Sequence, residues 1–233
     1  MHNFDFINEL LPHMLTQKNI VSYSHLLTID KKQGAGRKNT SKNIIKTTDN
    51  IFFPKQRDSL FWCFFIAFRG LHEYDMIHNF FTKEKEIKYK WIEELRDKKE
   101  IFKPIKISKV SVEDELANCP NISMTSVKAL CHLFDINIFY IDNKKFYEII
   151  IDDNKPIFVI EKRDKKYGLK KNLTNEQVEY YRNHFWKLEN LDKPLKAISS
   201  YKINDLRNIC SKLHIDFVSM TRPQMYQAIL SYL

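Results

Sequence analysis

The sequence predicts an α+β fold, in which a domain with a central apolar helix and an antiparallel sheet is followed by a small C-terminal helix-loop-helix module. Three observations predict it. Residues 60–68 are apolar on almost every side, which is typical of a helix at the centre of a core. Three β-rich runs separated by turn residues occupy positions 136–162. Two short stripes with helical spacing lie between residues 206 and 232.

The composition bounds the size and the location of the protein. The chain has 233 residues, of which 43% are hydrophobic, so it can bury one substantial core and carry a small extension. Its four cysteines form no CxxC pair, which argues against a zinc knuckle and favours a reducing compartment. No apolar run approaches the roughly 20 residues that cross a bilayer, and the N-terminus lacks a secretory pattern. We expect an intracellular protein that does not enter a membrane.

The formal net charge of +9 favours polyanionic partners, because lysine and arginine release counterions when they bind phosphates. An AT-rich genome, which favours lysine codons, would explain the same positive charge without any partner.

Residues 1–28 predict an N-terminal helical segment. Residues 29–50 predict a flexible basic linker, since KKQGAGRKNTSKNIIK contains no acid and cannot bury a core. Arg37 and Lys38 are its candidate contacts to DNA or another polyanion; the alternative is a solvated loop without a partner.

The main domain is expected over residues 51–190. Asp58 or Ser59 caps its apolar helix, and Gly70 closes it. Amphipathic helices follow over residues 72–99, with these inward positions: Phe80, Phe81, Ile87, Trp91 and Leu95.

The second half of that domain changes its periodicity. A helix is predicted over residues 123–135, followed by the runs INIFYID, KFYEIII and PIFVIEK, which we interpret as an antiparallel meander. A last short strand is expected around residues 167–169. Thr174 with Gln177 forms a capping box that opens a further helix.

The C-terminal module is expected over residues 193–233. Asn204 is the expected cap of its first helix, and Thr221 with Gln224 forms a capping box for the second. The stretch YKINDLRNICSKLHIDFVSMTRPQMYQAILSYL resembles the SAP and Rho-N type of helical module, except that His214 replaces the glycine which the family often carries before the loop. The resemblance implies DNA binding. Its phosphate contacts would be Lys202, Arg207, Lys212 and Arg222. The alternative is a protein-docking hairpin with solvated basic residues.

The larger unit resembles papain-like cysteine peptidases, and among them the ovarian-tumour (OTU) type. The resemblance rests on the DSLF entry into the apolar helix, the segment TSVKALCHLFDINIFYI and the strand pair ending at KKYGL. Proteins with a DSLFWC element and a C-terminal helical hairpin are also similar to those of large cytoplasmic DNA viruses. In the OTU family the nucleophilic cysteine opens the helix and a histidine stands near the last strand. Ser59 and Lys166 occupy these places, which implies a fold kept without its chemistry.

The alternative hypothesis is an active peptidase or deubiquitinase that acts on a ubiquitin-like protein and uses a different set of residues. Cys63 would be the nucleophile, Gln56 the oxyanion donor and His184, in the sequence NHFWKL, the general base. The competing interpretation places Cys63 in the core, because the second turn of an apolar helix keeps a thiol protonated. We expect no metal or other cofactor, since no ligand cluster or phosphate loop is present.

The sequence therefore leaves three hypotheses about function. The first is a non-catalytic, degenerate OTU-like viral protein that docks on nucleic acid or on a protein through its basic segments and its SAP-like module. The second is an active cysteine peptidase, and the third is a structural virion component. Each implies a host cytoplasm or a virion as the location.

Overall fold

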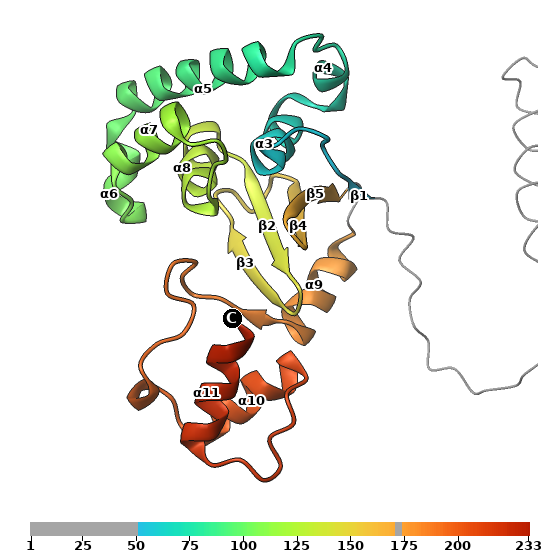
Figure 1. Cartoon of the computed structure of the whole chain (residues 1–233), viewed down its shortest axis with the longest axis vertical. Coiled ribbons are helices and arrows are strands. Elements are labelled where there is room, and N and C mark those ends of the chain that lie inside the picture. The colour runs from blue at the N-terminus through green and yellow to red at the C-terminus, as the bar shows by residue number, and fades with distance from the viewer. Residues whose placement is uncertain (1–50, 171–173) are drawn as a thin grey trace, which may run out of the picture. The chain divides into compact units, whose positions relative to one another are not determined.

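The computed structural model describes residues 51–170 and 174–233 (Figure 1). The helical segment predicted over residues 1–28 and the basic linker over residues 29–50, with Arg37 and Lys38, lie outside the described residues. Where it is described, the chain is a mixed α+β protein, as the sequence predicts.

A six-stranded open sheet forms the middle of the α+β domain (Figure 1). Its strands are β1 (Ile51–Phe52), β2 (Asn137–Asp142), β3 (Lys145–Ile149), β4 (Ile157–Arg163), β5 (Lys166–Lys170) and β6 (Trp186–Lys187). They lie in the order β1-β5-β4-β2-β3-β6. β2 pairs with β4 and β3 with β6 in parallel, while the other neighbours are antiparallel.

The predicted antiparallel meander is therefore wrong at one step. β2 and β3 form the expected hairpin, but β4 lies on the far side of β2 and not beside β3. The segment that joins β3 to β4 crosses β2, and the buried side chain of Asn137, at the start of β2, holds this segment in place. Its Oδ1 accepts hydrogen bonds from the backbone of Ile151 at 2.7 Å and Asp152 at 3.2 Å, and its Nδ2 donates to the carbonyls of Asp152 at 2.6 Å and Lys155 at 3.1 Å. These bonds satisfy the polar backbone of the crossing segment.

Helices cover one face of the sheet (Figure 1). They are α3 (Ser59–Arg69), α4 (Leu71–Asp75), α5 (Phe80–Asp97), α6 (Phe102–Ile105), α7 (Lys109–Asn118) and α8 (Met124–Phe134), with a 3-10 turn at Lys99–Ile101. The prediction of a buried α3 is confirmed, because every residue from Ser59 to Ala67 is buried. Asp58 caps it by accepting from the Phe61 amide at 3.1 Å, and the Gly70 amide closes it on the Ile66 carbonyl at 2.8 Å.

One inward position predicted on α5 is wrong. Phe81 is 70% exposed, whereas Trp91 and Leu95 are buried as expected. Asn79 caps α5 by accepting from the Thr82 amide at 3.1 Å, and this start turns the second residue of the helix towards solvent. The ammonium of Lys85 lies over the exposed ring, 4.5 Å from its centroid.

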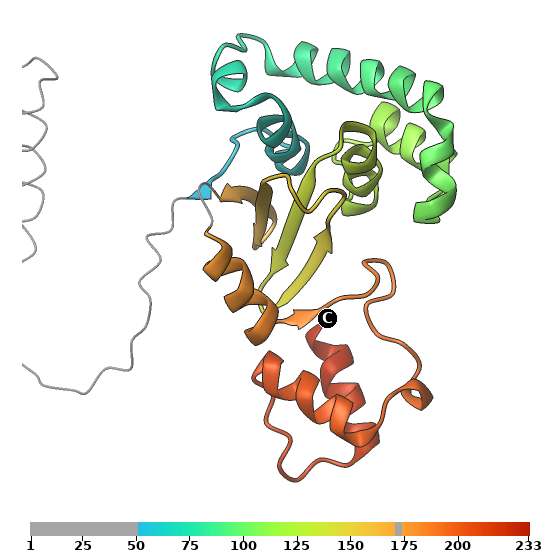
Figure 2. The same cartoon turned by 180° about the vertical axis from the view of Figure 1, so that it is seen from behind.

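The opposite face of the sheet carries α9 (Asn175–His184), which Figure 2 shows from behind. Val178 and Tyr181 of this helix pack with Phe139, Ile141 and Val159 in a cluster separate from the one that contains α3. Alternate residues of β2 point to the two clusters, as the two-residue period of a strand requires. The capping box of Thr174 and Gln177 is confirmed.

The C-terminal module consists of α10 (Ile203–Leu213) and α11 (Arg222–Tyr232), preceded by a 3-10 turn at Ile198–Ser200. Its capping box at Thr221 and Gln224 is confirmed. The predicted cap at Asn204 is wrong, because Lys202 is the capping residue. The carboxylate of Asp205 accepts from the Lys202 backbone amide at 2.8 Å, which starts the helix before Asn204 and leaves that side chain exposed in the first turn.

His214 ends α10 in the left-handed region, with φ of 57°. A residue with a Cβ is strained there by about 1 kcal/mol or more relative to glycine. We therefore expect His214→Gly to raise the free energy of unfolding by about 1 kcal/mol in a denaturant titration. Arg207→Gly, an exposed interior position of the same helix, is the control and should lower it by about 1 kcal/mol. A loss of stability in His214→Gly would contradict the expectation.

Candidate functional site

The start of α3 is where the peptidase resemblance places the nucleophile. Ser59 is 4% exposed there, and its hydroxyl oxygen accepts a hydrogen bond of 3.0 Å from the backbone amide of Tyr167 on β5. That bond ties the helix to the strand. The hydroxyl therefore works as a structural acceptor in a closed contact and not as a group presented to a substrate.

Lys166, at the place of the family's histidine, precedes Tyr167 on β5 and is exposed. The hydrogen bond from the Tyr167 amide to Ser59 places Lys166 one residue away from the start of α3 along β5. The two side chains differ in their surroundings, because one is buried and the other is in solvent. A lysine acts as a base near neutral pH only when it is desolvated.

A buried charged network surrounds Asp58, the residue before Ser59. Its Oδ2 accepts from the Lys88 ammonium at 2.7 Å and from the Ile122 amide at 3.0 Å. Lys88 also donates to Glu84 at 2.8 Å, and Glu84 accepts from the indole of Trp62 at 3.0 Å. Burial raises the pKa of the Asp58 carboxyl above its ordinary value, while the Lys88 ion pair opposes that rise. The sequence places Lys88 and Glu84 only among the outward charges of an amphipathic helix.

The alternative nucleophile, Cys63, is fully buried, and its Sγ donates to the Tyr167 carbonyl at 3.4 Å. Burial, with a smaller contribution from the Asp58 charge, raises the pKa of this thiol well above its ordinary value. Gln56 accepts from the Tyr74 hydroxyl at 2.7 Å, so it is held by α4. These surroundings keep the sulfur protonated.

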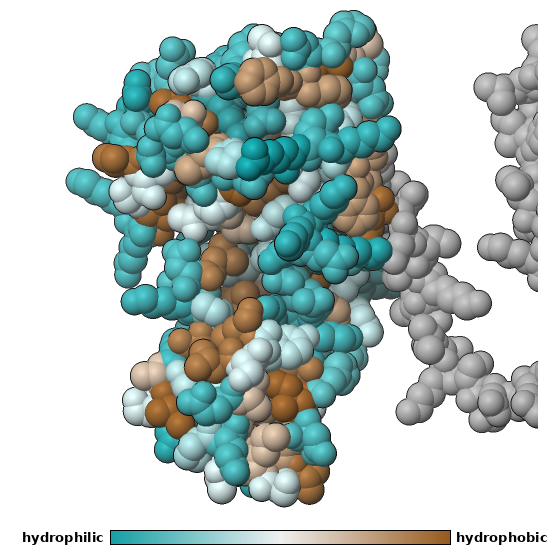
Figure 3. All heavy atoms as spheres, in the orientation of Figure 1, coloured by the Kyte–Doolittle hydropathy of each residue, from teal (hydrophilic) through white to brown (hydrophobic). Residues whose placement is uncertain are grey.

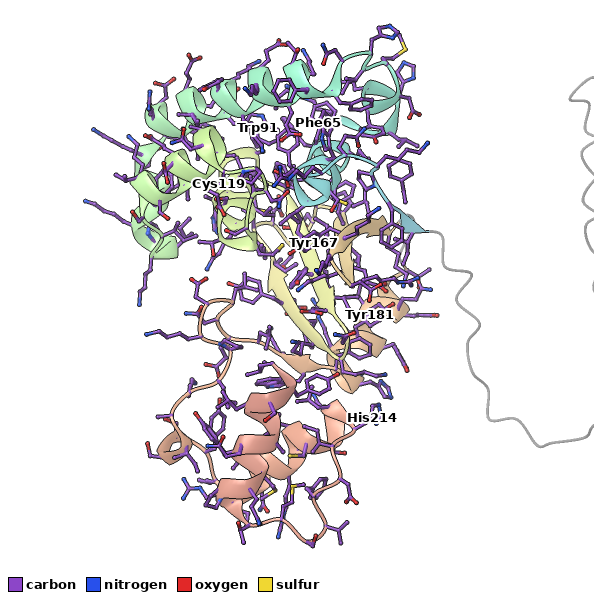
Figure 4. All side chains as sticks on the ribbon, viewed as in Figure 1. Phe65, Trp91, Cys119, Tyr167, Tyr181 and His214 are labelled. Atoms are coloured by element: carbon purple, nitrogen blue, oxygen red, sulfur yellow. The ribbon has the colours of Figure 1, made fainter. Side chains whose placement is uncertain are left out.

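His184, the proposed base, is the last residue of α9 and is exposed. Its Nδ1 lies 2.9 Å from the Tyr180 carbonyl, and its ring stacks on that of Tyr180 with centroids 4.2 Å apart. α9 packs against the face of the sheet opposite to α3. Figure 4 labels Tyr181 of α9 below Tyr167, the residue of β5 that bonds the start of α3. The structure therefore does not bring Cys63 and His184 together.

The four basic residues proposed on the C-terminal module have different surroundings. Lys202 and Arg207 are exposed, and Arg207 reaches only the Asn204 side chain, at 3.5 Å. Lys212 is half-buried. Arg222 donates from its guanidinium to the Ile198 carbonyl at 2.6 Å, which holds α11 to the preceding turn. Lys202 and Arg207 are thus the pair best placed to meet a phosphate.

A groove of about 740 Å³ lies where α10 contacts β6 and the segment after it. Its lining includes Trp186, Lys193, Lys196, Tyr201 and Lys212. Apolar side chains also gather on the module in the view of Figure 3. Val218, in the loop between the two helices, is 93% exposed. Sequence reasoning missed this groove, because it forms only when the module meets the sheet edge.

No protein-family model matches the chain, and no curated protein or solved structure is significantly similar to it. Among residues 51–170 and 174–233, no group of three or more histidine, cysteine or acidic side chains is arranged to hold a metal ion. Of the helices in this described part, none combines the length and the apolar character that crossing a membrane requires.

Proposed function

We propose that the chain is a non-catalytic, viral-type binding protein on a degenerate OTU-like scaffold, which docks on nucleic acid through its C-terminal module and its basic segments. The observation that carries the proposal is the state of Ser59. Its hydroxyl is buried and accepts a hydrogen bond from the Tyr167 amide at the helix start, where the peptidases that the chain resembles carry a thiol. The Asp58 carboxylate lies at the same positive end of α3 and accepts from the Phe61 amide, so a negative charge already stands beside the place where a thiolate would form.

The binding half of the proposal is supported by the charge of the C-terminal module. From Lys193 to Leu233 the sequence has six lysine or arginine residues against Asp205 and Asp216. Exposed cations on a small helical module are suited to contacts with the phosphate backbone, which give affinity without sequence preference.

The test is binding of the full chain to a fluorescein-labelled duplex, followed by anisotropy across a salt series. Replacing Lys202 and Arg207 by Gln should make the slope of log K against log salt shallower by about 1.8, at about 0.9 per lost phosphate contact. The matched control replaces Lys99 and Lys103, two exposed lysines near α6, by Gln and should keep the wild-type slope. Absence of salt-dependent binding by the wild-type chain would contradict the binding half of the proposal.

A ubiquitin-type suicide probe tests the non-catalytic half in the same preparation. We expect no covalent adduct, because Cys63 is buried and its Sγ donates to the Tyr167 carbonyl. An adduct that disappears in Cys63→Ala would instead support the active peptidase.

The second candidate function is docking on a protein, including a virion component. The observation that favours it is that the module exposes four large apolar side chains, with Val218 93% exposed, and protein interfaces concentrate such groups: Ile203, Val218, Leu230 and Leu233. Loss of a copurifying protein in Val218→Asp, with DNA affinity unchanged, would support this candidate.

A further inference from the structure

Two basic segments that are far apart in the sequence meet beside β5. β1 pairs with β5, and the following Phe53 packs on Gly168, where an added Cβ would lie 2.7 Å from the phenylalanine ring. At the other end of the segment that begins with Phe53, the Ser59 hydroxyl accepts a hydrogen bond of 3.0 Å from the Tyr167 amide. Residues 53–59 are thereby held beside the turn that joins β4 to β5.

Five cations lie on the two segments that meet at this junction. We call them the β4–β5 basic surface, and they are Lys55, Arg57, Arg163, Lys165 and Lys166. All five are exposed. Arg163 also lies over the Phe53 ring, 6.0 Å from its centroid, which links the two segments directly.

The acids near this surface neutralise it only in part. Glu161 is paired with Arg163 at 2.7 Å and with Lys170 at 3.5 Å, and Asp58 is buried against Lys88. Within the described residues, the side chains of Lys55, Arg57, Lys165 and Lys166 form no ion pair. Asp164, in the turn itself, is a single acid among them. The surface therefore keeps a net positive charge.

We propose that the β4–β5 basic surface binds the phosphodiester backbone of a nucleic acid, as a contact separate from the C-terminal module. This inference rests on the proposed nucleic-acid binding and gives it a second site. A nucleic acid fits better than a protein, because no large apolar side chain is exposed within residues 51–58 or 161–168. Protein interfaces concentrate aromatic and apolar groups at their centre, whereas phosphate contacts are made by flexible cations of one sign.

Two basic surfaces on one chain also predict a particular form of binding. Each surface alone gives weak, salt-sensitive affinity, and engagement of both by one strand raises the overall affinity through effective concentration. Removing either surface should therefore reduce affinity for a nucleic acid long enough to reach both.

The experiment uses the full chain and a labelled mixed-sequence duplex, with the matching single strand as a second probe. Lys165→Gln combined with Lys166→Gln should weaken duplex binding about tenfold or more at low salt and make the salt slope shallower by about 1.8. The Lys99→Gln, Lys103→Gln variant removes the same charge elsewhere and should keep the slope of the wild type. Circular dichroism of each variant verifies that the fold is retained.

The outcomes separate this inference from the proposed function. A surface variant that matches the control, while the Lys202→Gln, Arg207→Gln variant loses affinity, overturns the inference and leaves binding by the module in place. Loss in the surface variant alone supports the inference and removes the module from the proposed function. Equal losses in the surface variant and the control would show attraction by net charge only and would overturn the inference. If the wild-type chain does not bind nucleic acid, both the inference and the proposed function are wrong.

Discussion

Lys88→Met should lower the free energy of unfolding at neutral pH by about 3–5 kcal/mol, the range expected when one partner of a buried ion pair is removed. Lys88 is 5% exposed and bonds both Asp58, at 2.7 Å, and Glu84, at 2.8 Å. Without its ammonium, the Asp58 carboxylate stays 1% exposed with only backbone donors. The measurement is a denaturant titration, and Lys90→Met on the exposed side of α5 is the control, with an expected change within about 0.5 kcal/mol.

The pH dependence of that loss identifies its cause. Burial already raises the pKa of Asp58, and removal of Lys88 eliminates the largest opposing influence. The folded state of the variant then holds a proton at pH values where the unfolded chain has released it, so stability is present below the ordinary pKa and is lost as pH rises through the folded pKa. The variant should therefore lose less stability at pH 5 than at pH 8. An equal loss at both values would indicate a packing defect instead of an unpaired carboxylate.

The second large effect is expected at Asn137. Asn137→Ala removes four hydrogen bonds to the segment between β3 and β4, and should lower the free energy of unfolding by about 3 kcal/mol. The full sum of four bonds is not expected, because water can reach part of the freed backbone. Asn154→Ala is the matched control, since Asn154 is exposed in the same connection and bonds only the Asp152 side chain, and it should change stability by about 0.5 kcal/mol or less. Similar effects of the two substitutions would show that Asn137 does not hold the crossover.

The sequence predicted elements better than their pairing, for physical reasons. The all-round apolar pattern of α3 and its cap at Asp58 are local properties, and both are confirmed. The β-rich composition of residues 136–142 indicates a strand, but it does not say which strand lies on each side. The side chain that decides this, Asn137, is one polar residue inside an apolar run. The position of β4 therefore could not be predicted from periodicity.

At the candidate site, too, the sequence predicts local features but not the contacts between distant segments. The sequence located Ser59 at the start of the helix, because caps have a local signature. It did not reveal that the hydroxyl bonds the Tyr167 amide, more than a hundred residues later, or that Lys88 is buried among residues that look like an ordinary charged helix. Both facts depend on which surfaces meet. His184 is a candidate base for Cys63 because of the aromatic residue that follows it in the sequence. The sequence does not show that the sheet lies between the helices that carry these two residues.

The Asp58 network also limits whether a cysteine at the start of α3 could act as a nucleophile. A thiol introduced at residue 59 would enter a closed contact beside a carboxylate, and a negative neighbour disfavours a thiolate. Ser59→Cys alone would therefore give an inert side chain. A reactive thiol at this position would need a histidine on β5, an open approach and a rearranged acid together. Because none of these changes alone makes the position reactive, the closed start of α3 is a barrier to acquiring thiol chemistry one substitution at a time.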